Sequence, residues 1–251
     1  MEYILLFIFG AAVGSFVNVV ALRYGSGLSF AYGRSVCFSC SKRLSWYELI
    51  PIISYIALRG RCSACHSRFS IQYFLVEIFT GTSFVWLFFK FGLSFEFLLL
   101  SIIYCLLSII FIYDLHHKII PDLFVLLFIL FSFAFSIIHN SYPIIHTLLA
   151  ALLIPLPFFL IWLFSKGRLL GLGDAKLMAG MGLLLGIWGA VSAVFLSFWI
   201  GAAFILILYL HKKIFSTSYN ITMKSEIPFA PFLVLGTVLT FFFEINFLNF
   251  S

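Results

Sequence analysis

Long apolar stretches separated by short polar connections restrict the fold of this chain more than any other feature. A helix of about 20 apolar residues is long enough to cross the hydrocarbon core of a bilayer. The sequence therefore predicts an all-α polytopic membrane protein with about eight transmembrane helices. The stretch at 176–210 allows two short helices that meet at Gly186–Gly189, or one span with a re-entrant piece. The apolar stretches lie near residues 3–22, 71–89, 95–113, 122–138, 147–165, 176–190, 191–210 and 227–248.

The composition excludes an ordinary soluble domain. Of the 251 residues, 63% are hydrophobic and 10% are charged, whereas soluble domains average about 45–50% apolar and about 25% charged residues. The net charge of +6 is explained by Lys and Arg residues that retain loops at the cytoplasmic face. The chain has no basic arm or basic repeat, so we expect a lipid bilayer and no nucleic acid among its partners.

The positions of the basic residues predict the orientation in the membrane. With the N-terminus outside, every Lys and Arg except Lys90 falls in or beside a loop on the cytoplasmic side. The opposite orientation would place nearly all of them on the wrong side of the membrane. We therefore expect an N-out and C-out protein.

Only one polar stretch is long enough to form a separate unit. It covers residues 23–70, between a first transmembrane helix at 1–22 and a transmembrane core at 71–251. The first apolar stretch has no positive charge before it and no A-x-A site after it. We therefore expect it to remain as a helix and not to be removed as a signal peptide.

Four of the five cysteines lie in this insert as two C-x2-C pairs, Cys37 with Cys40 and Cys62 with Cys65. Two such pairs supply four thiolates for one tetrahedral Zn²⁺. An insert of this size builds little hydrophobic core, so a bound metal would stabilise it. Two disulfides are the alternative, but disulfides are rare in the reducing cytoplasm, where the charge pattern places the insert. The pattern therefore predicts a structural zinc site.

Three aspartates lie at the predicted cytoplasmic ends of spans: Asp114, Asp122 and Asp174. Carboxylates are costly inside a bilayer and usually mark function there. Gly171 and Gly173 would leave space for a peptide beside Asp174, whereas Asp122 is explained by helix capping. Two carboxylates from different helices can share one proton and activate a water. Asp114 and Asp174 therefore fit an aspartic protease, with interface or capping roles as the alternative.

Several further segments stand out, in this order along the chain: Gly14–Val19, the two C-x2-C pairs, Trp46–Ser54, Arg59–Cys62, Glu77, Asp114 with Pro121 and Asp122, Gly171–Leu177 and Pro228–Leu233. Together they resemble the segments of the prepilin peptidases. These are the type IV leader peptidases, which are membrane aspartic proteases of the GxGD kind. One departure is Ala230, where the resemblance leads us to expect Gly.

This resemblance implies a bifunctional enzyme of the bacterial plasma (inner) membrane with its active site facing the cytoplasm. It would cleave the basic leader from prepilin or pseudopilin substrates of type IV pilus and protein secretion systems, with Asp114 and Asp174 as the catalytic pair. It would then methylate the new N-terminal amine with S-adenosylmethionine. The four cysteines would hold zinc beside the methylation function, since members without the cysteine insert are peptidases only. No glycine-rich cofactor loop supports methylation independently.

Three further charged residues are candidate contacts for the substrate or cofactor. Glu48 could bind a Lys of the leader, although a solvated surface position is the simpler expectation. Glu77 lies inside the second span and needs a partner, for which Asn18 or an Arg of the insert is available. Leader recognition or methyl transfer is the alternative for Glu77. Lys176 could keep Asp174 ionised, or simply retain its loop at the cytoplasmic face.

Two other classes of protein fit parts of the sequence. An ion or metal transporter would use intramembrane carboxylates, but these would be expected near the midplane, and the chain shows no internal repeat. A zinc-bearing membrane scaffold would account for the cysteines and would need neither Asp114 nor Asp174. The peptidase is favoured because both aspartates fall on the face where a basic leader would be presented.

Overall fold

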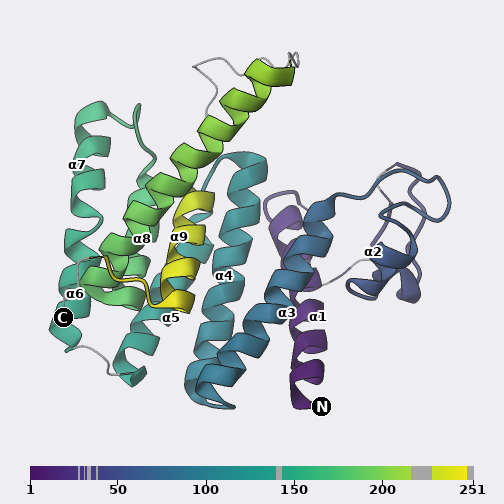
Figure 1. Cartoon of the computed structure of the whole chain (residues 1–251), viewed down its shortest axis with the longest axis horizontal. Helices are drawn as coiled ribbons and strands as arrows, with labels where there is room; N and C mark the ends of the chain where they lie inside the picture. The colour runs from purple at the N-terminus through teal and green to yellow at the C-terminus, as the bar shows by residue number, and fades with distance from the viewer. Residues whose placement is uncertain are drawn as a thin grey trace. The chain divides into compact units, whose positions relative to one another are not determined.

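Helices form the apolar stretches, as expected where backbone polar groups must be satisfied without water. No β-strand occurs among the residues described, so the all-α prediction is confirmed. A computed structural model describes residues 1–27, 29–30, 32, 35–37, 39–139, 143–215 and 228–247, with the backbone alone for 212–215. The elements are α1 (Glu2–Arg23), η1 (Trp46–Leu49), α2 (Ile53–Ala57), α3 (Ile71–Phe91), α4 (Phe95–His117), α5 (Asp122–His139), α6 (Ile144–Leu153), α7 (Leu156–Ser165), α8 (Leu172–Phe215) and α9 (Ala230–Phe243) (Figure 1).

Within the described ranges, six helices are long and apolar enough to cross a membrane, namely α1, α3, α4, α5, the pair α6–α7 and α8. The apolar helix α9 is shorter, with 14 residues. Helix α8 is interrupted at Gly186, whose φ of 69° and ψ of −174° are not helical. The stretches expected at 176–190 and 191–210 therefore form two helical arms that meet at this glycine.

The chain forms two compact units, Met1–Ile112 and Tyr113–Ser251. The boundary lies inside α4, so the candidate aspartates Asp114 and Asp174 belong to the same unit. The division into 1–22, 23–70 and 71–251 stays a prediction. Of the basic residues used for the orientation, Arg34 and Lys224 lie outside the described residues, as do the side chains of Lys212 and Lys213.

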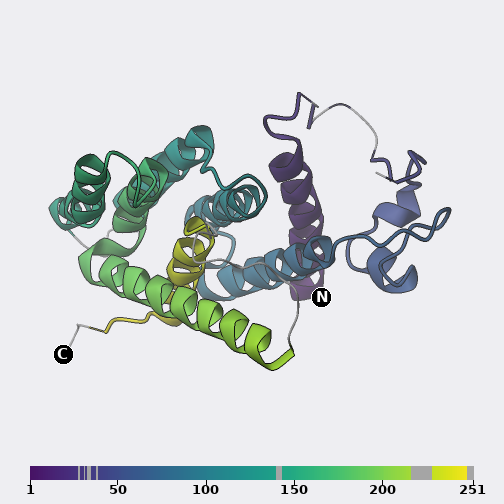
Figure 2. The same ribbon diagram turned by 90° about the horizontal axis from the view of Figure 1, so that it is seen from above.

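In the first unit, small residues allow α1 and α3 to pack closely, as both views show (Figures 1 and 2). A Cβ atom added to Gly10 would lie 2.9 Å from Cα of Gly81, and one added to Gly14 would lie 2.9 Å from Oγ1 of Thr80. Gly10 and Gly14 are four residues apart and share one face of α1. This is the small-residue packing by which membrane helices associate.

In the second unit, glycines set the packing of both arms of α8. Gly180 lies directly against the ring of Phe128 in α5, and a Cβ on Gly182 would lie 2.7 Å from the backbone of Ala150 in α6. The other arm of α8 packs on α9, where Gly236 leaves no room for a side chain. These contacts bring the beginnings of α5, α8 and α9 to the end of the unit that contains the candidate aspartates.

Candidate active site and metal centre

Asp114 lies in the last turn of α4, with 4% of the residue exposed. The backbone N–H of Ala230, the first residue of α9, donates a hydrogen bond to its carboxyl group. The oxygen Oδ2 of Asp114 is buried and has no hydrogen-bond partner among the described residues. An unpartnered buried oxygen is costly, so this atom is available to a water or a substrate group.

Asp174 lies in the first turn of α8, with 7% of the residue exposed. The backbone N–H of Gly171, just before the helix, donates a hydrogen bond to its carboxyl group. Both Asp114 and Asp174 therefore accept an N–H at the start of a helix, where the helix dipole favours negative charge. Local backbone geometry holds each of the two carboxyl groups in place.

The two aspartates come from different helices, α4 and α8, and they meet at one end of the second unit. They are close enough for the charge of Asp114 to act on Asp174. Two carboxyl groups whose charges repel favour a state in which only one of them is ionised. The arrangement can supply one acid and one base to the same reacting group.

The two glycines before Asp174 have different roles. A Cβ on Gly173 would lie 2.8 Å from Cβ of Ile120, in the connection between α4 and α5, whereas one on Gly171 would lie 3.4 Å from Oδ2 of Asp174. Neither glycine has a positive φ. Gly173 therefore allows α8 to approach Ile120, and Gly171 lies beside the Asp174 carboxyl group, where space for a peptide stays a prediction.

Lys176 donates to Asp122, with Nζ 2.7 Å from Oδ1, and both side chains of this pair are exposed. Asp122 is the first residue of α5, as expected for a helix-capping carboxylate. The suggestion that Lys176 keeps Asp174 ionised finds no support, because the charge of Lys176 is directed to Asp122. The Asp122–Lys176 ion pair is exposed to solvent, whereas Asp114 and Asp174 are buried.

The two C-x2-C pairs fold into matching turns. The N–H of Cys37 donates to the carbonyl of Lys42, and the N–H of Cys62 donates to that of Ser67, both at 2.9 Å. The residues after the second cysteines, Ser41 and His66, both have a φ of 56°. The first cysteine of each turn is buried and the second is exposed. The insert thus contains one structural unit twice, a repeat that the sequence analysis missed.

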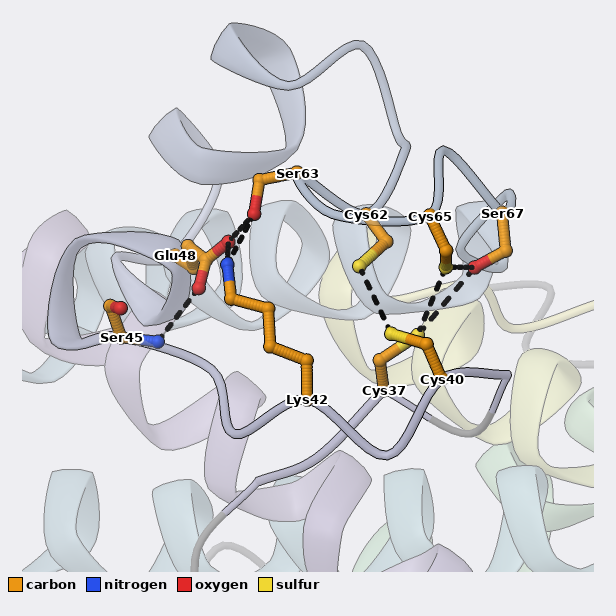
Figure 3. Close-up of polar contacts among 9 residues, drawn as sticks. All are labelled: Cys37, Cys40, Lys42, Ser45, Glu48, Cys62, Ser63, Cys65 and Ser67. Atoms are coloured by element: carbon orange, nitrogen blue, oxygen red, sulfur yellow. Dashed lines mark hydrogen bonds and ion pairs between the residues drawn. The ribbon is translucent and has the colours of Figure 1, made fainter.

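The four sulfur atoms form a compact cluster (Figure 3). All of them lie within 4.8 Å of one another, and the Cys37–Cys65 and Cys40–Cys62 pairs are 3.8 and 4.0 Å apart. Four ligands at about 2.3 Å from Zn²⁺ in a tetrahedron have neighbouring sulfurs about 3.8 Å apart. The cysteines are free of disulfides. Their geometry therefore fits a closed zinc site, which would supply structural support.

Ser67 favours the thiolate form within this cluster. Its hydroxyl is 3.5 Å from Sγ of Cys37 and 3.1 Å from Sγ of Cys65. The Ser67 hydroxyl, with backbone N–H groups of the first turn, lowers the pKa of the Cys37 thiol to about 6, whereas burial and the neighbouring cysteine sulfurs raise the pKa of the Cys40 thiol to about 11. Since thiolates are the metal-binding form of cysteine, the surroundings of Cys37 support the zinc assignment and those of Cys40 do not; the assignment rests on the distances between the sulfur atoms.

Glu48 joins the two cysteine turns (Figure 3). Its carboxylate accepts from Nζ of Lys42 at 3.1 Å and from the Ser63 hydroxyl, and these residues belong to different turns. The N–H of Ser45 also donates to it at 2.7 Å. The Ser45 N–H first, and then Ser63 and Lys42, lower the pKa of Glu48 to about 2. The expectation of a solvated position is wrong, because these partners bury Glu48 to 8% exposure.

Glu77 lies in α3 with 7% of the residue exposed. Its Oε2 accepts a hydrogen bond from the backbone N–H of Ile52 at 2.7 Å, and the Ser15 hydroxyl also bonds to the carboxyl group. The expected partners were Asn18 or an Arg. Asn18 instead bonds to the carbonyl of Gly14 and to Gln72. A backbone N–H of the insert thus takes the place that the sequence analysis gave to a side chain.

The N–H of Ala230 is the contact to the candidate aspartates that sequence reasoning missed. Backbone donors are not encoded by residue type, so the identity of Ala230 alone does not reveal this hydrogen bond. A signal was present, since Pro231 is at the first turn of a helix and prolines favour that position. It indicated a helix N-terminus, which is where backbone N–H groups are free to bind a carboxylate.

Comparisons with known protein families cover most of the chain. Residues 8–91 match the family described as the bacterial peptidase A24 N-terminal domain. Residues 101–206 match the type IV leader peptidase family. The first match contains the cysteine insert and Glu77, and the second contains both buried aspartates. No solved structure is significantly similar to the chain.

Relatives are similar over nearly their whole length. A Bacillus subtilis (strain 168) protein named prepilin leader peptidase/N-methyltransferase is 30% identical over 98% of this chain and 96% of its own. Proteins of the same name from Vibrio cholerae and Legionella pneumophila are 28% and 29% identical, over 96% and 98% of this chain and 98% and 93% of theirs.

These similarities do not favour a transporter or a scaffold. They extend across both units, and they agree with the resemblance found in the sequence. The helices of span length also make this a multi-pass membrane protein. With its N-terminal and peptidase regions both matched and a relative aligned end to end, the chain belongs to the type IV leader peptidase family.

Proposed function

We propose that this protein cleaves the leader peptide from prepilin-like proteins and then N-methylates the newly exposed N-terminal residue. The end-to-end similarity to relatives named prepilin leader peptidase/N-methyltransferase supports both activities. The observation that carries the peptidase activity is the pair of buried carboxyl groups, Asp114 and Asp174, which interact at one end of the second unit.

In this proposal, Asp114 and Asp174 hold one proton between them. The ionised carboxylate takes a proton from a water, whose oxygen attacks the scissile carbonyl carbon, while the protonated carboxyl group donates its proton to the carbonyl oxygen. The resulting tetrahedral species collapses and the C–N bond breaks; the leaving nitrogen takes a proton from the pair, and a hydroxyl group of the tetrahedral species returns one proton to it. The N–H groups of Ala230 and Gly171 orient the two carboxyl groups during these steps.

We place the active site at the cytoplasmic face of the bacterial plasma (inner) membrane. The basic residues support this orientation, since nearly all of them fall on the side of the loops that carry the aspartates. A prepilin or pseudopilin with a basic leader in the cytoplasm and an apolar helix in the membrane would present its cleavage point at that level. The division into a first helix, an insert and a peptidase core belongs to this proposal.

The insert serves the methylation half of the proposed reaction. Cys37, Cys40, Cys62 and Cys65 would hold a structural zinc, as the distances between their sulfurs support. S-adenosylmethionine would supply the methyl group. The hollow of about 440 Å³ in the first unit is lined by Tyr3, Phe7, Thr82, Val85, Trp86 and Phe89. This apolar lining does not fit a charged sulfonium and a ribose, so no residue is assigned to that cofactor.

A co-expression experiment tests the proposal. The enzyme, or its Asp174→Asn variant, is paired with a prepilin-like substrate, and the N-terminus of the product is read by mass spectrometry. We expect a leader-free, methylated N-terminus with the wild type and an intact leader with the variant. Retained cleavage in the variant would remove Asp174 from the catalytic pair, and absence of cleavage by the wild type across several prepilins would contradict the peptidase proposal.

A further inference from the structure

Residues 50–58 of the insert contact α3 at two points. The N–H of Ile52 donates to Oε2 of Glu77 at 2.7 Å. The ring of Tyr55 stacks on that of Phe74, with 5.1 Å between centroids and 24° between planes. Phe74 and Glu77 are three residues apart and lie on one face of α3. The segment is therefore held by one polar and one aromatic contact on a single helix face, and Figures 1 and 2 both show α2 near the N-terminal end of α3.

The chain at Ile52 adopts a conformation that is unfavourable for this residue. Ile52 has a φ of 65° and a ψ of −53°, and the N–H of Ile53 bonds to the carbonyl of Pro51 at 2.6 Å. This is a γ-turn whose central residue lies at positive φ, a rare and strained form. A β-branched side chain makes positive φ costlier still. The hydrogen bond from the Ile52 N–H to the Glu77 carboxyl group offsets that cost.

The end of the segment is fixed by Gly60. Its N–H donates to the carbonyl of Tyr55 at 2.8 Å, and its carbonyl accepts from the N–H of Phe69 at 2.7 Å. Gly60 has a φ of 65°, and a Cβ atom there would lie 2.8 Å from the Tyr55 ring. Gly60 thus keeps Tyr55 in its stacking position. Through Phe69 it also connects the segment to the residues that lead into α3.

Glu77 has little capacity left for a substrate. One carboxyl oxygen is bonded to the insert, the Ser15 hydroxyl bonds to the same group, and 7% of the residue is exposed. A carboxylate buried inside a membrane helix would otherwise be costly. The hydrogen-bond partners of Glu77 therefore indicate that it holds the insert in place. They argue against a direct role of its carboxyl group in methyl transfer.

We infer that Glu77 is a positioning residue, which together with Phe74 docks residues 50–58 of the insert on α3, and that N-methylation depends on this docking while leader cleavage does not. The inference rests on the proposed function for its link to methylation. The docking contact itself is independent of that link, because it is defined by the Glu77–Ile52 and Phe74–Tyr55 contacts.

The first test compares Glu77→Ala with Glu77→Gln in the full-length enzyme, using one prepilin and reading the cleaved and methylated products separately. Glu77→Ala removes the acceptor and leaves the Ile52 N–H without this partner, which should lower methylation about tenfold or more. An amide oxygen can still accept from Ile52, so Glu77→Gln should stay within about threefold of wild type. Cleavage and zinc content should remain near wild type in both. Glu2→Ala, at an exposed acidic residue of α1, is the matched control.

A second pair of variants changes the insert side of the same docking contact. Tyr55→Ala should reduce methylation as Glu77→Ala does, whereas Tyr55→Phe keeps the stacked ring and should retain it. This pair keeps the inference testable if removal of Glu77 prevents folding. Equal loss of methylation in Glu77→Gln and Glu77→Ala would overturn the inference, because it would show that the charge is required.

Hydrogen–deuterium exchange of residues 50–58 provides a readout that does not depend on activity. Deuterium uptake should rise in Glu77→Ala and stay near wild type in Glu77→Gln. Unchanged uptake in Glu77→Ala would overturn the docking assignment. A wild-type enzyme that cleaves without methylating would instead contradict the methyltransferase half of the proposed function, and the exchange result would still decide whether Glu77 docks the insert.

Discussion

The cysteine turns of the insert and the aspartates of the second unit are both clusters of polar side chains, but the chain assembles them differently. Each cysteine turn is formed locally, by hydrogen bonds between residues five positions apart. Asp114 and Asp174 lie far apart in the sequence and come together only through the tertiary fold of the second unit. The insert therefore relies on short-range backbone geometry and on the metal proposed for it, whereas the aspartate pair relies on the fold of a whole unit.

The two regions also differ in how completely their polar atoms are bonded. Glu48 accepts from Ser45, Ser63 and Lys42. In contrast, Oδ2 of Asp114 has no partner among the described residues. A fully bonded network specifies one structure, while an unpartnered carboxyl oxygen is available for chemistry. This difference agrees with the structural role proposed for the insert cluster and the chemical role proposed for the aspartates.

The largest effect is expected from loss of one cysteine ligand. Cys37→Ser and Cys62→Ser should each lower bound zinc from about one equivalent to nearly none, because structural zinc needs all four thiolates. Elemental analysis of the purified enzyme measures this. Cys105→Ser is the matched control, since Cys105 lies in α4 outside the cluster and should leave zinc unchanged. Full zinc content in the ligand variants would remove the metal from the account of the insert.

A smaller but clear effect is expected at the glycines before Asp174. In Gly173→Ala, the new Cβ would meet Ile120 at 2.8 Å and displace the start of α8. Misplacement of a catalytic group by about 1 Å costs up to about a hundredfold in rate, so cleavage should fall about ten- to a hundredfold. Gly171→Ala, with ordinary contact at 3.4 Å, should leave the start of α8 in place and reduce cleavage less. A greater loss of cleavage rate in Gly171→Ala than in Gly173→Ala, in a steady-state assay, would contradict this packing.

The acid response of the insert should depend on Glu48. Its pKa falls from the ordinary 4.5 to about 2 in the folded protein. Its stabilising contribution is therefore complete above about pH 4.5 and is lost as the pH falls towards 2. Protease protection of the insert should thus be greater in wild type than in Glu48→Gln at pH 6, and the two should converge at low pH. A difference that does not change with pH would show that the charge of Glu48 is not responsible.

The smallest effect is expected at the exposed ion pair. The Asp122–Lys176 pair has side chains that are 75% and 41% exposed, and such pairs contribute about 0–1 kcal/mol. Cleavage by Asp122→Asn should therefore stay within about twofold of wild type. A loss as severe as that of Asp174→Asn, in a variant that still folds, would place Asp122 in the catalytic group.

The sequence predicted those features of the fold and the site that depend directly on residue type and spacing. Apolar length predicted the helices, the C-x2-C spacing predicted the cysteine cluster, and the rarity of membrane carboxylates selected Asp114 and Asp174 for attention. The break in α8 was located only to the region around Gly186–Gly189, because several nearby glycines could each interrupt a helix. The structure places it at Gly186.

The partners of the buried carboxylates could not be predicted in the same way. Asp114, Asp174 and Glu77 all accept backbone N–H groups, and every residue except proline carries that donor. The partner of the flexible Lys176 side chain was equally hard to predict, since it bonds to Asp122 and not to Asp174. These choices depend on tertiary packing, which the sequence pattern does not contain.

The central claim is that the aspartate pair serves leader cleavage while the insert supports methylation, and product analysis of two complementary variants tests it most directly. Asp114→Asn is given a synthetic peptide that already lacks its leader, and Cys62→Ser is given an intact prepilin, each with S-adenosylmethionine. Mass spectrometry should show a methylated N-terminus in the first reaction and a cleaved, unmethylated N-terminus in the second. Failure of Asp114→Asn to methylate the leader-free peptide, together with failure of Cys62→Ser to cleave, would contradict the claim.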